Sequence, residues 1–273
     1  MSDTAAAVHP CCLKGFQWEG TPIGRIDKLA GHSTYITGTN PDIAILLIHD
    51  LLSWEFTNTR LLADHYAREV GATVYVPDFF GGETLPFEPI TSGRWHEVDV
   101  PGFLKENTRE IREPSIFTCA RALRNTYKKL GAVGFCFGGW AVFRLGAREH
   151  QPSLVDCISA GHPTFLTKRD IDEVAVPVQI LAPEIDPAFT RELKIYAFET
   201  IQGVGVGVPF VYRHFPGVEH ACFVRGDEKK EGEREALVRG KGAVVGWMRE
   251  FFVGCLGRGV VVEGDREGDA RSR

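Results

Sequence analysis

The chain has 273 residues and a formal net charge of −5, from 31 basic and 36 acidic side chains. Hydrophobic residues make up 44% of it and charged residues 25%, the composition of a soluble globular protein. No long basic run is present, which argues against nucleic acid or an anionic membrane surface as the partner. The longest apolar run, Ile43–Ile48, is far shorter than the ~20 residues of a membrane-spanning helix. The first ten residues do not resemble a signal peptide, so we expect a cytoplasmic protein.

The seven cysteines are scattered along the chain and form no C-x-x-C pair. This pattern predicts neither a zinc site nor a disulfide framework. The histidines offer no metal-ligand spacing either, since His162 and His214 lack partners. We therefore expect reduced thiols, no metal and no cofactor.

Strand and helix patterns alternate through most of the chain. The wholly apolar segment Ile43–Ile48 is typical of a strand buried on both faces. A helical spacing of apolar residues follows over 58–70, with Gly71 placed as its C-terminal cap. Continuing along the chain, we predict a strand at 73–76, a helix at 114–130, a strand at 132–135, a helix at 137–148, strands at 155–159 and 178–182, a helix at 187–201, a strand at 210–215 and a helix within 232–253.

Strands separated by helices of this length predict an α/β fold, with a mostly parallel central sheet and helices on both faces. Neither an internal repeat nor a domain boundary is evident, so residues 1–256 are expected to form one domain. The polar segment 257–273 is expected to be a disordered tail. Residues 81–113 are rich in glycine, proline and charge, and a loop of this length is typical of either a lid over a functional site or a disordered stretch.

A nucleophile motif lies between a predicted strand and a predicted helix, in the sequence Gly134-Phe135-Cys136-Phe137-Gly138. This is the G-x-nucleophile-x-G elbow of the α/β-hydrolase fold, with cysteine in place of serine. The glycines leave room for a sharp turn, and the helix that follows aims unpaired N–H groups at the sulfur. Those donors favour a thiolate and can hold an oxyanion. The alternative is a glycine-rich turn that carries an inert buried cysteine.

A catalytic cysteine needs a base, and the base needs a carboxylate that orients it. In this fold the acid and then the histidine follow the nucleophile along the chain. Asp186 after the strand at 178–182 and His220 after the strand at 210–215 satisfy both position and order. Glu184 is a rival acid, and Asp186 before a proline is also an ideal helix cap.

Around these residues the sequence resembles the dienelactone hydrolase family, whose members are cysteine hydrolases of the α/β-hydrolase fold. The similarity runs from about Cys11 to Phe252 and is greatest to fungal members. It implies a triad of Cys136, Asp186 and His220. The further motifs that carry it are Cys11-Cys12, Ile48-His49-Asp50, Leu61-Leu62-Ala63-Asp64 and Pro77-Asp78-Phe79-Phe80-Gly81-Gly82.

The resemblance also assigns auxiliary roles. A carboxylate at the end of an early strand assists the thiol in the family, and Asp50 holds that position here; Glu55 is a nearby alternative, and a turn-capping role for Asp50 is equally open. The backbone N–H groups of Leu51 and Phe137 would form the oxyanion hole.

Of the two arginines that bind the substrate carboxylate in bacterial members, one matches Arg225 and the other has no counterpart. This makes a small carboxylated dienelactone a doubtful substrate. Trp54, Phe79, Phe80 and Phe165 are expected at the strand ends and suggest an aromatic substrate, although each alone is equally consistent with the core.

The sequence thus favours a cysteine-dependent hydrolase of a lactone, enol ester or thioester, acting on an aromatic or polyketide-like small molecule of secondary metabolism. One alternative is a non-hydrolytic tailoring enzyme that uses the same residues for cyclisation, isomerisation or dehydration. Another is a binding protein that has lost the chemistry, which an intact triad disfavours. The sequence does not choose between a monomer and a homodimer.

Overall fold

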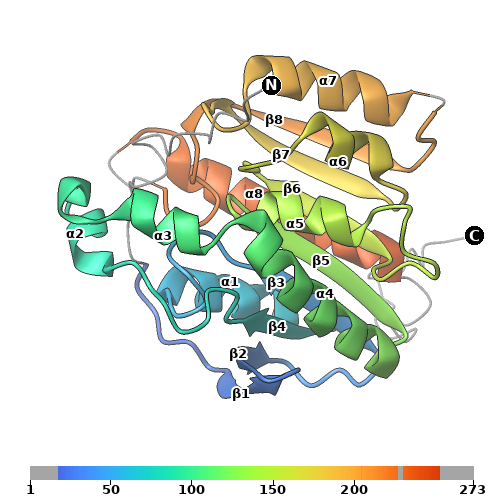
Figure 1. Cartoon of the computed structure of the whole chain (residues 1–273), viewed down its shortest axis with the longest axis horizontal. Helices are drawn as coiled ribbons and strands as arrows, with labels where there is room; N and C mark the ends of the chain where they lie inside the picture. Colours follow the sequence, from blue (N-terminus) through green and yellow to red (C-terminus); the bar gives the residue numbers. More distant parts are fainter. Residues whose placement is uncertain (1–17, 204, 227–229, 253–273) are drawn as a thin grey trace, which may run out of the picture.

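The central strand of the fold is β3 (Ile43–Ile48), in which all six residues are apolar and completely buried. A strand with no polar face needs neighbouring strands on both sides and helices over both faces. In the computed structural model, which describes residues 18–203, 205–226 and 230–252, β3 lies inside an eight-stranded sheet of order β1-β2-β4-β3-β5-β6-β7-β8 (Figure 1).

All neighbouring strands from β4 to β8 are parallel, as the alternation of strands and helices predicts. Their carboxyl ends therefore meet at one edge of the sheet, where ligands bind in open α/β folds. These strands are β4 (Thr73–Pro77), β5 (Lys129–Phe135), β6 (Cys157–Gly161), β7 (Val178–Ile185) and β8 (Phe210–Glu219).

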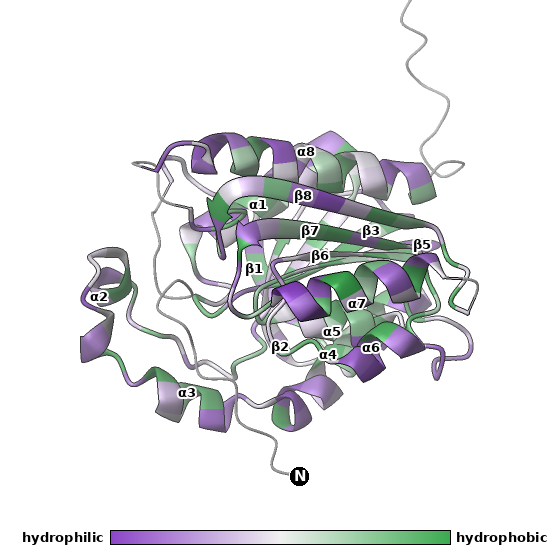
Figure 2. Ribbon diagram, turned by 90° about the horizontal axis from the view of Figure 1, so that it is seen from above, coloured by the Kyte–Doolittle hydropathy of each residue, from purple (hydrophilic) through white to green (hydrophobic). Residues whose placement is uncertain are grey.

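Helices cover both faces of the sheet, which confirms the predicted layers. In Figure 2, α1 and α8 lie on one face and α4 to α7 on the other. None of the helices in the described part of the chain has the length and hydrophobicity that a membrane crossing requires. The helices are α1 (Thr57–Tyr66) with its π-helical extension η2 (Ala67–Gly71), α4 (Arg109–Thr126), α5 (Gly138–Leu145), α6 (Lys168–Glu173), α7 (Arg191–Gln202) and α8 (Glu233–Phe252).

An antiparallel hairpin at one edge of the sheet was not predicted. It consists of β1 (Arg25–Leu29) and β2 (His32–Thr37), joined by Ala30 and Gly31, both at positive φ. Two such residues make the tight turn that suits the twist of a hairpin. Most of β1 is exposed, so its apolar pattern is weak. Because β2 pairs antiparallel with β4, the sheet is mostly rather than wholly parallel.

The segment 81–113 is more ordered than the predicted loop. It contains α2 (Phe87–Thr91), the short 3-10 helix η3 (Trp95–Glu97) and α3 (Val100–Glu106). The helix expected to start at Pro114 begins instead at Arg109, so Pro114 lies inside α4. It ends at Thr126, earlier than predicted, because β5 already starts at Lys129.

Other boundaries shift by smaller amounts. The strand predicted at 155–159 is found at Cys157–Gly161. The helix predicted from residue 187 starts at Arg191, because the residues before it form a turn and the side chain of Thr190 accepts from Leu193 N–H as the helix cap. Helix α6 was not predicted at all. The predicted tail at 257–273 lies outside the described residues.

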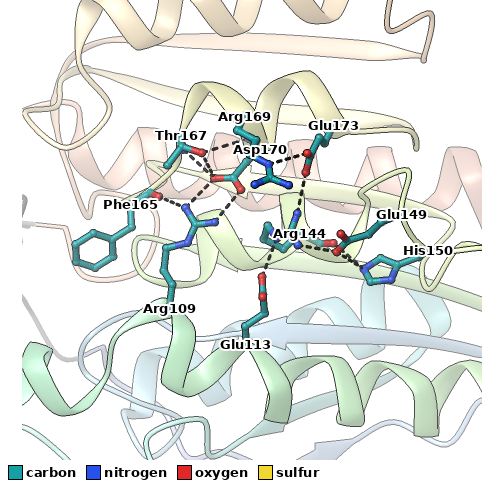
Figure 3. Close-up of polar contacts among 10 residues, drawn as sticks. All are labelled: Arg109, Glu113, Arg144, Glu149, His150, Phe165, Thr167, Arg169, Asp170 and Glu173. Carbon is teal, nitrogen blue, oxygen red and sulfur yellow. Dashed lines mark hydrogen bonds and ion pairs between the residues drawn. The ribbon is translucent and has the colours of Figure 1, made fainter. Parts of the chain in front are cut away.

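Two arginines tie together the helices of one face, as Figure 3 shows. Arg109 of α4 forms a two-pronged ion pair with Asp170 of α6, with both N–O distances 2.8 Å. Asp170 also accepts hydrogen bonds from the backbone N–H and side-chain hydroxyl of Thr167, which caps α6. Arg144 of α5 contacts the carboxylates of Glu113, Glu149 and Glu173.

The Arg109–Asp170 pair predicts a clear effect on stability. Asp170 is only 3% exposed, so its removal would leave the Arg109 charge without its carboxylate partner and would remove the side-chain half of the Thr167–Asp170 capping box. We expect Asp170→Ala to lower the free energy of unfolding by about 3 kcal/mol in urea titrations. The control is Glu192→Ala, which removes the exposed partner of Lys168 and should change stability by less than about 0.5 kcal/mol. Equal effects of the two variants would contradict this interpretation.

Two buried histidines occupy the carboxyl ends of inner strands. His49 follows β3; its Nδ1–H donates to Asp50 O and its Nε2 accepts from Phe79 N–H. His162 follows β6, and its Nδ1 accepts from the backbone N–H of Cys136 at 3.1 Å. Burial lowers the pKa of both imidazoles below 6.5, and the nearby charges of His220 and Arg225 lower the pKa of His162 further. Both rings are therefore held in the neutral form.

This neutrality makes stability depend on pH. Below about pH 6.5 the unfolded chain binds a proton on each of these histidines and the folded protein does not. The free energy of unfolding therefore decreases as the pH is lowered, by up to about 1.4 kcal/mol per pH unit for each ring. Urea titrations at about pH 7.5, 6.5 and 5.5 should show a shallower fall for His162→Gln than for the native protein. The exposed His96 provides the control, because His96→Gln should keep the native slope. If the free energy of unfolding of His162→Gln depended on pH as steeply as that of the native protein, His162 would not be the neutral buried group described here.

Candidate active site

Cys136 lies at the sharp turn between β5 and α5, with φ of +49° and no exposed surface. This left-handed conformation is uncommon for a residue with a side chain. It requires small neighbours, because a Cβ on Gly134 would collide with the carbonyl of Gly138, and one on Gly138 with the carbonyl of Ile48. The strand, turn and helix expected from the motif are therefore all present around Cys136.

His220 and Asp186 come together as a buried pair. His220 follows β8 and Asp186 follows β7, and the distance from His220 Nδ1 to Asp186 Oδ1 is 2.8 Å. Both side chains are fully buried. Asp186 Oδ1 also accepts from the N–H groups of Ala188 and Phe189 in the turn before α7. The alternative of a helix cap is wrong, because the N-cap of α7 is Thr190. The rival Glu184 instead accepts from Gly217 N–H.

Thr164 joins the cysteine to the histidine. Its Oγ1 lies 3.3 Å from Cys136 Sγ and 3.5 Å from His220 Nε2. The sequence analysis did not identify Thr164. The available signal was its place directly after β6, the strand next to β5. The hydroxyl links the three predicted residues into one connected series of contacts.

His162 is a second histidine within the site. Besides its hydrogen bond to the backbone of Cys136, its ring stacks on Phe223, with centroids 5.3 Å apart and planes at 9°. The centroids of His162 and His220 are 4.7 Å apart. Its position before Asp186 in the chain excluded it as the base, and the geometry instead makes it a support for the backbone of Cys136.

Asp50 and Arg225 form a buried ion pair. Arg225 Nε lies 2.7 Å from Asp50 Oδ2, and neither side chain has exposed surface. The other oxygen of Asp50 accepts from Leu52 N–H, which is the turn-capping contact expected as the alternative. Glu55, the alternative carboxylate, is exposed. The two charges that the sequence assigned to thiol activation and substrate binding therefore face each other.

The two residues expected to form the oxyanion hole follow neighbouring strands. Leu51 follows β3, and Phe137 follows Cys136 after the end of β5. These two strands pair in parallel along the whole of β3, from Ile43 to Ile48. Neither N–H donates to an acceptor within the part of the chain that the structure describes. The structure therefore does not exclude the oxyanion-hole role that the resemblance implies for them.

Three of the four predicted aromatic residues, Trp54, Phe79 and Phe80, are buried, and the four differ in their neighbours. Phe80 packs edge-on against Phe137 and against Phe103 of α3, with both centroid distances 4.9 Å. Phe79 packs near the ring of His49, and the guanidinium of Arg60 lies over Trp54. Phe165, which is partly exposed, lies 6.3 Å from Phe137. Phe80 and Phe165 therefore both pack near the ring of Phe137, whereas Trp54 packs against an arginine.

No group of three His, Cys, Asp or Glu side chains suited to a metal ion occurs among residues 18–203, 205–226 and 230–252. The polar groups of the site instead suit attack on a carbonyl carbon: a thiol, an imidazole with an orienting carboxylate, and backbone donors for an oxyanion.

Comparison with known proteins identifies the family of the chain. The model of the dienelactone hydrolase family matches residues 33–252. A hydrolase of Talaromyces stipitatus, hydrolase tropI, is 28% identical over 250 residues, which cover 89% of this chain and 96% of the relative. The human carboxymethylenebutenolidase homolog is 34% identical over 146 residues, 52% of this chain and 57% of the relative.

Solved structures share the fold. A putative dienelactone hydrolase from Klebsiella pneumoniae superposes with a TM-score of 0.64 at 15% identity, over 84% of this chain and 99% of its own. An esterase from Pyrobaculum calidifontis has a TM-score of 0.58 at 13% identity, over 85% of this chain and 87% of its own. The fold is therefore that of α/β hydrolases, and the chain belongs to the dienelactone hydrolase family.

Proposed function

We propose that this hydrolase uses Cys136 as its nucleophile and cleaves a lactone, enol ester or thioester of an aromatic or polyketide-like small molecule. The observation that carries the proposal is the continuous series of contacts from Cys136 Sγ through Thr164 to His220 and Asp186. A thiol, a base and an orienting carboxylate in contact are what covalent acyl transfer requires.

In the proposed reaction the Cys136 thiolate attacks the acyl carbon, and the N–H groups of Leu51 and Phe137 hold the oxyanion. The His220 imidazolium gives its proton to the departing oxygen or sulfur, and the acyl group stays on the sulfur. His220 then removes a proton from water, which attacks the thioester and frees the thiol. Asp186 keeps the His220 Nδ1 protonated, so that Nε2 faces the reacting atoms.

The surroundings support an uncharged, flat substrate. The rings of Phe80 and Phe165 pack near the ring of Phe137, whose backbone N–H is a proposed oxyanion donor. A substrate carboxylate directed at Arg225 would have to compete with Asp50 for a guanidinium that is already paired and buried. An aromatic acyl group needs no such exchange.

We further propose that the enzyme works in the cytoplasm, in secondary metabolism. Cys119, Cys157 and Cys222 form no disulfide within the described part of the chain, which is consistent with a reducing compartment. The aromatic rings packed near Phe137 support a role in secondary metabolism, because they suit an aromatic or polyketide-like substrate.

Replacing Cys136 tests the nucleophile. Cys136→Ala should lower turnover of aryl esters and lactones by at least about a thousandfold, because the loss of one triad member removes the concerted chemistry. Cys119→Ala is the matched control: burial raises the pKa of that thiol to about 12, and it lies on α4 against Leu29 O, so turnover should stay at the native rate. Native turnover by Cys136→Ala would refute the proposed function.

Isotopic labelling separates hydrolysis from non-hydrolytic tailoring. In isotopically labelled water, each product acid should carry one labelled oxygen, since water attacks the thioester carbon. A product without label would instead favour ring closure, isomerisation or dehydration by the same histidine. Mass spectrometry of the product after a single turnover makes this measurement.

A further inference from the structure

The loop between β6 and α6 carries a hydroxyl that contacts both reacting atoms of the proposed site. Thr164 Oγ1 lies 3.3 Å from Cys136 Sγ and 3.5 Å from His220 Nε2. A hydroxyl can donate one proton and accept another at the same time. Thr164 is therefore in place to move a proton between sulfur and nitrogen.

The position of this hydroxyl is fixed by the nucleophile itself. The Thr164 N–H donates to the carbonyl of Cys136 at 2.9 Å, so the two backbones are joined directly. Thr164 is 9% exposed, and a β-branched side chain has few rotamers. Any shift of the loop would therefore move the hydroxyl relative to the sulfur.

The loop is held in an unfavourable backbone conformation on both sides of Thr164. His162 has φ of +38° and Phe165 has φ of +58°. Such residues persist only where the surroundings hold them, and they are concentrated at functional sites.

The restraint on the far side of the loop comes from Arg109. Its guanidinium donates to the carbonyl of Phe165 at 2.7 Å and pairs with Asp170, which in turn caps α6 through Thr167 (Figure 3). The loop is thus anchored to β6 at one end and to α4 and α6 at the other. The strained backbone at His162 and Phe165 and these anchors hold Thr164 in its position between the sulfur and the imidazole.

We propose that Thr164 is a further catalytic residue, whose hydroxyl relays the proton from Cys136 to His220. The Cys136 S–H bond breaks as a new bond forms to Thr164 Oγ1, while the original O–H proton moves to His220 Nε2. Thr164 regains a neutral hydroxyl, and the products are a thiolate and an imidazolium. The relay rests on the proposed function and adds a residue that the triad does not contain.

The test is the rate at which iodoacetamide alkylates Cys136, measured by peptide mass spectrometry between about pH 5 and 10. Thr164→Val keeps the shape and loses the hydroxyl, whereas Thr164→Ser keeps the hydroxyl. At neutral pH we expect about ten- to a hundredfold slower alkylation in Thr164→Val, with the midpoint of the profile moved to higher pH, and native behaviour within about threefold in Thr164→Ser. All variants keep the charged residues Asp50, Arg225 and Asp186 and the neutral His162. Differences between the pH profiles of the variants therefore do not come from these groups.

Thermal unfolding checks that each variant is folded, and Thr164→Ala replaces Thr164→Val in the comparison if the valine variant does not fold. A native rate and midpoint without the hydroxyl would overturn the relay, as would equal losses in the serine and hydroxyl-free variants. Native turnover of aryl esters by Cys136→Ala would show that the proposed function itself is wrong, whatever the alkylation rates of the Thr164 variants. Slow alkylation of Cys136 in Thr164→Val, together with fast alkylation in the native protein, supports both the relay and the proposed function.

Discussion

The left-handed backbone of Cys136 is the constraint on which the site depends. Positive φ at a non-glycine residue costs about 1–3 kcal/mol, and the surrounding packing has to offset that cost. Here the carbonyl of Cys136 accepts from Gly139 N–H and from Thr164 N–H, and a Cβ on Gly139 would collide with Pro163. The turn therefore brings the loop after β6 against Cys136, the proposed nucleophile.

The parallel sheet supplies the other groups at the same edge. Asp50 follows β3, Asp186 follows β7 and His220 follows β8, so residues far apart in the sequence meet where these strands end. The site is also buried, which strengthens each electrostatic contact in it and penalises any charge without a partner. The Asp50–Arg225 and His220–Asp186 pairs satisfy that requirement, and His162 meets it by remaining neutral.

The sequence predicted the parts of this structure that local patterns encode. The apolar run of β3 and the glycine spacing around Cys136 are local signals, and both elements were found where expected. Strand β1 was missed because its residues are mostly exposed, and the start of α4 was missed because a proline inside a helix usually marks its first turn. Thr164 and the Asp50–Arg225 pair were missed because their contacts join segments that only the folded chain brings together.

The most direct test of the central claim is the mass of the intact protein after brief mixing with a panel of aryl esters and lactones and rapid quenching in acid. The account predicts a mass increase equal to one acyl group, which peptide mapping assigns to Cys136. An acyl group carried by any other residue would contradict it.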